Sequence, residues 1–339
     1  MPQYGFGPEL SFKKLVEQNP FLFRVYTPRP LGPFFDESEP YFLGGSFTEE
    51  ADDSIPDANM RPRAQSLKGD TLPTSYADVV RHLDWTTKSS SPFVSTSFSF
   101  AWAVWDACRR YKLGVKHDVH IAVIDAKVLV DRAVTAVELL NESSQKERHR
   151  DHWKFHRFAQ ESQNVLVYGS IPGTAVLSST PLLSVLEALP SYFLRPSLDF
   201  HQKDTSVMSR LTWEYVPKKS TYRQFCKEMS EHFLRMEDRH RLRDTTTGSI
   251  RLALRFLRAR FHERVLDDLD ASCVMVYQLA LAIAAWPGQW WVREHPEIPD
   301  LIRSCVDIVG EEIREARRAK VVAEVARLQS IVDDLEWLA

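Results

Sequence analysis

Glycine is scarce in this chain, and the glycine-rich phosphate loops are missing. Only 12 of the 339 residues are glycine, and neither G-x-G-x-x-G nor G-x-x-x-x-G-K-[S/T] occurs. In those motifs, backbone N–H groups at the start of a helix approach a phosphate closely. A phosphate site built on such a loop is therefore disfavoured. The G-x-S-x-G turn that exposes a serine nucleophile is also missing, which gives acyl hydrolysis little support.

Cysteine pairs and long apolar runs are missing as well. The chain has four scattered cysteines, Cys108, Cys226, Cys273 and Cys305. They form no C-x-x-C pair, which favours buried free thiols in a reducing compartment. The longest apolar run, residues 271–286, is interrupted by Gln278 and is shorter than the roughly 20 residues that span a bilayer. Residues 1–18 lack the pattern of a signal peptide. We therefore expect a cytoplasmic protein without a membrane segment.

An excess of one charge is also absent. The net charge is −3, so the chain as a whole shows no sign of binding nucleic acid. The length suits roughly two domains, and 44% hydrophobic residues supply material for real cores. Residues 28–75 are rich in Pro, Gly and acids and read as a long loop insertion. Strand patterns stop before residue 190, and helical patterns fill the chain from 219 onward. The sequence thus predicts an α+β domain over 1–190, a linker over 191–218 and an all-α helical bundle over 219–339.

The second part follows a 3.6-residue period throughout. The predicted helices cover residues 221–243, 249–268, 271–286, 299–310 and 311–338. One of them crowds five arginines on one side, Arg251, Arg255, Arg258, Arg260 and Arg264. This face could bind RNA or an acidic partner, but a solvated face neutralised by nearby acids is the simpler interpretation.

The C-terminal tail mixes charges with apolar residues at helical spacing. Residues 313–339 could form a coiled coil with a second copy of the chain, or could pack within their own bundle. The sequence therefore allows both a homodimer and a protein partner that binds the C-terminal helices.

The most informative segment is a short strand of hydroxyl residues followed by a helix. Residues 91–97 read Ser-Pro-Phe-Val-Ser-Thr-Ser, and an apolar helical pattern follows over 98–111. Ser97 or Ser99 is placed to cap that helix. Small hydroxyls at the end of a strand, just before a helix N-terminus, suit a ribose- or phosphate-binding edge.

Other strands accompany this one. Residues 21–26, Phe-Leu-Phe-Arg-Val-Tyr, form a strand whose one charge is Arg24. A guanidinium in such a strand is costly to bury without an anion. Residues 119–124 and 165–172 provide two further strands, the last ended by Gly169 and a proline.

These elements together resemble the mono-ADP-ribosyltransferase core of the cholera-toxin-like Arg/Ser/Glu class. The closest likeness is to an uncharacterised fungal domain family with that core. The matching pieces are Phe23-Arg24-Val25, Leu83-Asp84-Trp85, residues 91–95 and residues 165–172. The resemblance implies a split β-sheet core with flanking helices, and NAD as the cofactor.

The resemblance also implies roles for particular residues. Arg24 would contact the phosphates or ribose of NAD. Ser95 would support the nicotinamide site and orient a catalytic glutamate, and Thr96 and Ser97 would complete the pocket.

The sequence departs from the family at the catalytic carboxylate. Where Glu-x-Glu or Gln-x-Glu is expected, the letters are Ser162-Gln163-Asn164, so Asn164 takes the place of the glutamate. An amide can bind a ribose hydroxyl but does not stabilise the positive charge that develops when the nicotinamide bond breaks. Glu161 is the nearest substitute, although its odd offset from Asn164 points it to the opposite strand face unless a bulge intervenes.

Two functional classes therefore stay open. In the first, Glu161 or Asn164 supports mono-ADP-ribosyl transfer or NAD glycohydrolysis. In the second, the chain is a pseudoenzyme that acts through its helical half. A third idea, a zinc site formed by His149, His152 and His156 on one helical face, is weak because no cysteine and no metalloprotease glutamate accompanies them, and we expect no metal.

Overall fold

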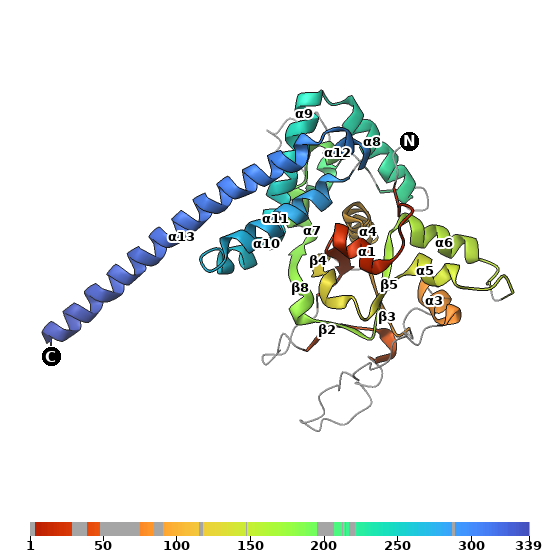
Figure 1. The fold of residues 1–339 in the computed structure, drawn as a ribbon, viewed down its shortest axis with the longest axis horizontal. Helices are drawn as coiled ribbons and strands as arrows, with labels where there is room; N and C mark the ends of the chain where they lie inside the picture. The colour runs from red at the N-terminus through yellow and green to blue at the C-terminus, as the bar shows by residue number, and fades with distance from the viewer. Residues whose placement is uncertain are drawn as a thin grey trace, which may run out of the picture. The chain divides into compact units, whose positions relative to one another are not determined.

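The computed structural model shows two compact units (Figure 1). The first contains Met1–Leu182 and Tyr215–Lys227, and the second contains Leu183–Glu214 and Glu228–Ala339. The structure describes residues 4–28, 39–47, 75–84, 91–114, 118–146, 148–194, 207–211, 213, 215–216, 221–286 and 289–338. Most of the predicted insertion over 28–75 and most of the predicted linker over 191–218 lie outside these described residues.

The first unit is built on a six-stranded sheet. Its strand order is β5-β6-β3-β1-β4-β8, and each neighbouring pair is antiparallel. A second sheet pairs β2 with β7. The strands are β1 (Phe21–Tyr26), β2 (Pro40–Leu43), β3 (Phe93–Ser97), β4 (His120–Asp125), β5 (Ala133–Thr135), β6 (Asn164–Tyr168), β7 (Ser170–Pro172) and β8 (Val176–Pro181). Together with the helical second unit, this sheet confirms the predicted α+β class.

The central strands carry apolar residues on both faces, and helices and loops cover these residues. Leu22, Ile121 and Leu166 are fully buried, one on each of three different strands. β-branched and aromatic residues favour such pleated, packed positions. The strand interior is therefore dry, and any polar side chain in it must find a partner or bear an energetic cost.

Side-chain caps start several helices of the first unit. Ser75 and Asp78 form a capping box at one helix, and the Ser99 hydroxyl accepts a hydrogen bond from the Trp102 N–H at another. Of the two serines predicted to cap that second helix, Ser99 is the one that does so. The helices are α1 (Phe12–Gln18), α3 (Tyr76–Leu83), α4 (Phe100–Lys112), α5 (Ala136–Asn141) and α6 (His152–Glu161).

The second unit is helical. The predicted helix over 221–243 is two helices, because the chain turns at Met236 and Glu237. The described helices from residue 182 onward are α7 (Leu182–Glu187), α8 (Tyr222–Arg235), α9 (Asp238–Arg243), α10 (Ser249–Arg264), α11 (Leu269–Ala284), α12 (Gln289–Glu294) and α13 (Glu297–Leu338).

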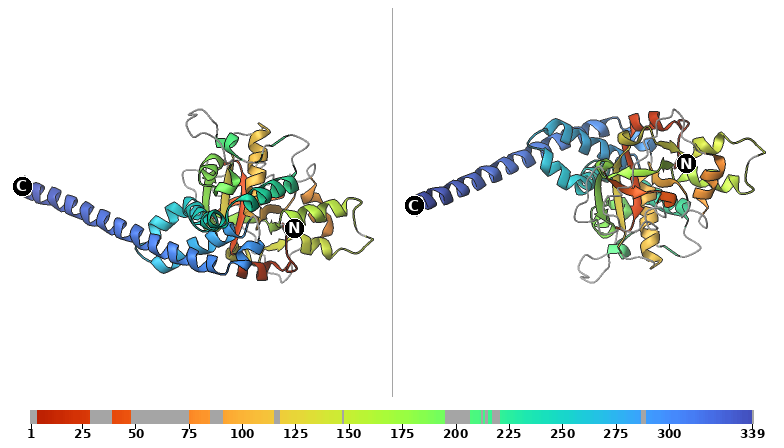
Figure 2. Two further views of the ribbon diagram at one scale, coloured as in Figure 1. Left: turned by 90° about the horizontal axis from the view of Figure 1, so that it is seen from above. Right: turned by 90° about the horizontal axis from the view of Figure 1, so that it is seen from below.

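The predicted break at Gly310 was wrong. Residues 299–310 and 311–338 form one 42-residue helix, α13. Glycine often ends helices, but here it serves close packing: a Cβ at Gly310 would lie 2.5 Å from the Cys273 sulfur. The C-terminal part of α13 extends away from the other helices of its unit in both views of Figure 2.

Candidate functional site

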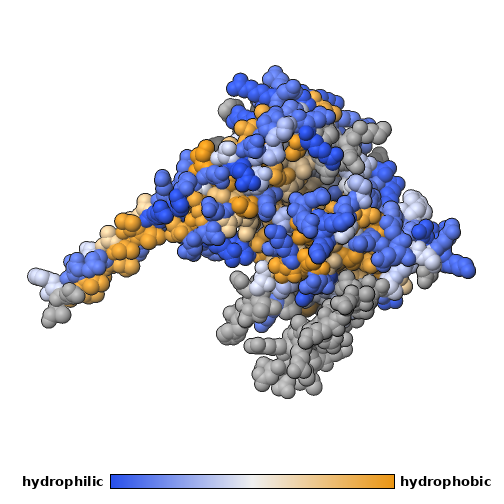
Figure 3. Space-filling model, in the orientation of Figure 1, coloured by the Kyte–Doolittle hydropathy of each residue, from blue (hydrophilic) through white to orange (hydrophobic). Residues whose placement is uncertain are grey.

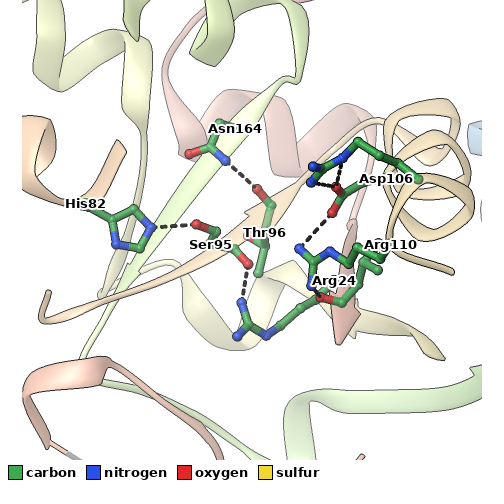
Figure 4. Close-up of polar contacts among 9 residues, drawn as sticks. Arg24, His82, Ser95, Thr96, Asp106, Arg110 and Asn164 are labelled. Atoms are coloured by element: carbon green, nitrogen blue, oxygen red, sulfur yellow. Dashed lines mark hydrogen bonds and ion pairs between the residues drawn. The ribbon is translucent and has the colours of Figure 1, made fainter. Parts of the chain in front are cut away.

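Three strands that are far apart in the sequence are neighbours in the sheet. β3 lies between β1 and β6, so the arginine strand, the hydroxyl strand and the strand that starts at Asn164 are adjacent. The Arg24 Nη1 donates a hydrogen bond of 2.6 Å to the backbone carbonyl of Ser95 (Figure 4). The structure therefore brings together the residues on which the resemblance depends.

Arg24 is a buried cation with few partners. Its guanidinium carbon lies 4.8 Å from the centroid of the Phe42 ring, and its Nε has no hydrogen-bond partner. No described carboxylate forms an ion pair with it. Burial, reinforced by the nearby Arg110, lowers the pKa of Arg24 to about 10. The guanidinium remains charged at neutral pH, so a largely buried positive charge has no counter-ion among the described residues.

The strand register separates the polar side chains into two sets. Phe23 pairs with Ser97, which places Arg24 and Thr96 on one face and Ser95 and Ser97 on the other. Arg24 nevertheless reaches β3 through the backbone carbonyl of Ser95. The Thr96 hydroxyl donates to the carbonyl of Val165 at 3.2 Å, which fastens β3 to β6.

Ser95 belongs to a chain of hydrogen bonds through a buried histidine. His82 Nε2 lies 2.5 Å from the Ser95 hydroxyl, and His82 Nδ1 lies 2.8 Å from the Ser91 hydroxyl. The His82 side chain sits in the last turn of α3 and is only 2% exposed. In a neutral ring one nitrogen donates and the other accepts, so the imidazole fixes the orientation of both hydroxyls. The sequence analysis missed His82.

Ser97 has a structural role. Its hydroxyl donates to the carbonyl of Ser162 at 2.6 Å and accepts from the Ser99 N–H at 2.9 Å. This serine therefore holds the turn between α6 and β6 rather than facing a ligand. In the same turn Gln163 has a φ of +48°, a left-handed conformation that costs a non-glycine residue roughly 1 kcal/mol. The strained turn sets the start of β6.

Asn164 is the first residue of β6 and is 4% exposed. Its Nδ2 donates a long hydrogen bond of 3.4 Å to the carbonyl of Thr96. Its Oδ1 has no partner, which is unusual for a buried carbonyl oxygen. The side chain therefore has a buried acceptor without a partner at the start of β6 (Figure 4).

The nearby carboxylates are already engaged. Glu161 ends α6, and its Oε1 lies 2.9 Å from Arg157 Nε and 2.6 Å from Arg223 Nη2. No hydrogen bond or ion pair among the described residues joins Glu161 to Arg24, Ser95 or Asn164. The structure thus offers no support for Glu161 as the substitute carboxylate.

Asp106 in α4 is bound by two arginines. Its oxygens lie 2.6 Å from Arg109 and 2.7 Å from Arg110. Burial alone would raise the pKa of Asp106, but Arg110 and Arg109 hold that pKa below its ordinary value. This carboxylate is ionised and satisfied, so it does not serve as counter-ion for Arg24.

The three histidines near α6 have separate hydrogen-bond partners. His152 Nδ1 lies 3.0 Å from the Tyr76 hydroxyl, and His156 Nε2 lies 3.2 Å from Asn141 Oδ1. His149 precedes the helix and accepts from the Asp151 N–H. Across the described residues, no group of three or more His, Cys, Asp or Glu side chains has the arrangement of a metal site.

The arginine face of α10 borders a cavity of about 440 Å³ in the second unit. Arg255 is paired with Glu187 at 3.2 Å, and Arg251 donates to the carbonyl of Leu189. Two of these arginines therefore make contacts within the unit. This agrees with a helix face whose charge is partly neutralised, which was the simpler interpretation of the sequence.

Part of the chain matches the model of a known family. Residues 17–185 match the model of a family described as a domain of unknown function, DUF7587. The matched segment contains every described strand, together with Arg24, His82, Ser95, Thr96, Ser97, Glu161 and Asn164. No match is found among the curated proteins. Among the described helices, none combines the length and the apolarity that crossing a membrane requires.

Proposed function

We propose that the first unit is an ADP-ribosyltransferase-like domain that binds NAD but has lost efficient cleavage of it. The observation that carries the proposal is the buried Arg24 guanidinium, which has no described counter-ion and lies against a strand of hydroxyl residues. A buried charge is costly unless an opposite charge joins it. The pyrophosphate of a dinucleotide is an anion that a guanidinium recognises well.

Candidate polar groups for the ribose lie on β3 and β6, with their side chains on the face of the sheet opposite to Arg24. The Ser95 hydroxyl is oriented by His82, and the Asn164 Oδ1 is a buried acceptor without a hydrogen-bond partner. The resemblance of β1, β3 and β6 to the Arg/Ser/Glu core supports NAD over other nucleotides, and the lack of a glycine-rich loop agrees with binding through side chains.

The site lacks a free carboxylate that could promote the cleavage of NAD. Breaking the bond between nicotinamide and ribose develops positive charge on the ribose, which a carboxylate stabilises. Asn164 is uncharged, Glu161 is bound by two arginines, and Asp106 is bound by two others. Mono-ADP-ribosyl transfer and NAD glycohydrolysis would both need that missing charge, so we infer a pseudoenzyme that keeps its ligand.

Isothermal titration calorimetry of the full chain with NAD tests the proposal. We expect the parent to bind and Arg24→Ala to bind at least about tenfold more weakly, because a charge-assisted contact to phosphate is lost. Arg150→Ala is the matched control, since this arginine is exposed outside the site, and it should bind like the parent. Absence of binding by the parent, or equal binding by Arg24→Ala, would reject the proposal.

A turnover assay separates binding from catalysis. The parent should release no nicotinamide from NAD above the buffer background. Release by the parent that disappears in Glu161→Gln would show an active enzyme with Glu161 as its carboxylate, and would refute the pseudoenzyme interpretation.

A further inference from the structure

The C-terminal half of α13 has no partner within its own unit. Near the start of the helix, Ile298, Ile302 and Val306 are between 0 and 2% exposed. From Arg318 to Trp337 every residue whose side chain is described is exposed. The alternative that this tail packs within its own bundle is therefore wrong for these residues. At roughly 1.5 Å per residue, about 30 Å of helix is left without contacts.

Apolar residues line one side of this bare segment. Val321, Val325, Leu328, Val332 and Leu335 follow one another at spacings of four, three, four and three. Each is between 46 and 60% exposed. Alternating steps of three and four keep these side chains on one side of the helix, as in the seam of a coiled coil. Figure 3 shows apolar surface along the distal part of this helix.

We propose that a second copy of this chain covers the seam, so that the two α13 helices form an antiparallel two-stranded coiled coil. The seam is complementary to itself, because none of its five positions from Val321 to Leu335 carries a charge or a buried polar group. Valine occupies one set of seam positions and leucine two of the three in the other, so all five positions present an apolar side chain to the partner helix.

Charge sets the orientation of the two helices. The root of the exposed segment carries Arg318 and Lys320, with Arg317 directly before them and no acid from residue 316 to 323. Its tip carries acids alone, Asp333, Asp334 and Glu336. A parallel pair would place like charges beside each other at both ends, whereas an antiparallel pair places the basic root of each copy beside the acidic tip of the other.

Arg318 also favours the antiparallel orientation. It lies in line with the seam, three residues before Val321. In a parallel pair Arg318 would meet its own copy. In the antiparallel register that sets Val325 opposite Leu328 of the second copy, Arg318 lies opposite Leu335. Its aliphatic stem can then cover that leucine while the guanidinium reaches the acidic tip. The seam is short, about two heptads, so we expect an association that is visible only at micromolar concentrations.

Sedimentation velocity of the full chain over about 1 to 200 µM tests the dimer. The parent, 39.1 kDa as a monomer, should approach twice that mass at the upper concentrations. Leu328→Glu should remain a monomer throughout. Ala323→Glu, on the opposite side of the exposed helix, is the matched control and should dimerise like the parent. Because Leu328 is half exposed, its replacement leaves the monomer fold intact, which circular dichroism will check. A parent that stays monomeric, or a Leu328→Glu variant that still doubles in mass, would overturn the proposal.

Disulfide trapping tests the orientation. Arg318→Cys and Leu335→Cys are prepared separately and oxidised alone and as a mixture, with the parent as control for its own cysteines. The antiparallel register predicts a cross-link between the two variants in the mixture and little within either variant alone. Strong cross-linking within Arg318→Cys alone would contradict the antiparallel arrangement.

Discussion

The sheet of the first unit buries polar groups that lack full partners, whereas the exposed half of α13 leaves apolar side chains in contact with solvent. In the sheet, the Arg24 guanidinium and the Asn164 carbonyl oxygen are buried without full partners. On α13, Leu328 and four valine or leucine neighbours are exposed without partners. Proteins bury apolar groups and pair buried polar ones, so both exceptions motivate a search for a binding partner.

The two exceptions call for different partners. A largely buried cation beside the backbone of the hydroxyl strand suits a small anion. An exposed apolar stripe along a helix suits another helix. The proposed ligand site and the proposed assembly surface share no residue, so each can be tested while the other is left intact.

The largest expected effect concerns His82, which joins the two serines of the site. His82→Ala should lower the free energy of unfolding of the first unit by about 2–3 kcal/mol, because two hydroxyls lose their partner and a cavity forms. His149→Ala, at an exposed position, is the control and should change the stability by less than ~0.5 kcal/mol. Thermal unfolding of the two variants measures the difference. Equal stability would show that the hydrogen-bonded chain through His82 is unimportant.

A second change sharpens the view of Arg24 as an uncompensated charge. Arg24→Met should stabilise the ligand-free protein by about 1 kcal/mol, because an apolar side chain of similar length replaces an unpaired buried cation. Arg110→Met is the matched comparison. Arg110 is paired with Asp106 at 2.7 Å, so its replacement should destabilise the protein. Destabilisation by Arg24→Met as large as that by Arg110→Met would mean that Arg24 has a structural counter-ion.

A third change adds the missing charge. Asn164→Glu should raise nicotinamide release from NAD at least about tenfold above the parent, or ~1.4 kcal/mol in the barrier, because a carboxylate then faces the developing positive charge. Asn164→Gln keeps an amide and should stay at background. Adding Arg24→Ala to Asn164→Glu should remove the gain. Failure of Asn164→Glu in a folded protein that binds NAD would show that more than one catalytic group has been lost.

The smallest expected effect is a dependence on pH. Burial, then Arg148 and His156, lower the pKa of His152 from its ordinary 6.5. The unfolded chain therefore takes up the proton first, and folding stability should decrease as the pH falls through about 6.5. The loss should be small, because solvent screens a ring that is partly exposed. Unfolding curves of the parent and His152→Asn at pH 5 and pH 7 will show it, and an equal loss in both would assign it to another group.

Much of the first unit could be predicted from the sequence because its signals are local. β1, β3 and β4 are runs of apolar and β-branched residues, and the observed strands match those runs. The predicted strand over 165–172 was wrong as a single element, because it divides at Gly169 into β6 and β7, which lie in different sheets. Arg24 was identified because it is the one charge in its strand, and Asn164 because the resemblance places a glutamate there. The adjacency of β1, β3 and β6 came only from the resemblance, since no local pattern determines strand order.

Other features depend on contacts that the sequence does not display. His82 lies in the last turn of an amphipathic helix, where an exposed histidine would look the same, and its partner Ser95 is 13 residues away. Ser97 was expected in the pocket, but its hydroxyl holds the turn at Ser162 instead. Gly310 suggested a helix end, whereas its role is close packing against Cys273 in α11. In each case tertiary packing overrode the local signal.

The central claim is that the Arg24 guanidinium is the anchor of a nucleotide site. A side-by-side calorimetric titration of the parent and Arg24→Met with NAD tests it most directly, because this variant is expected to be at least as stable as the parent. The account predicts binding by the parent and none by Arg24→Met. Undiminished binding by Arg24→Met, or no binding by the parent, would contradict it.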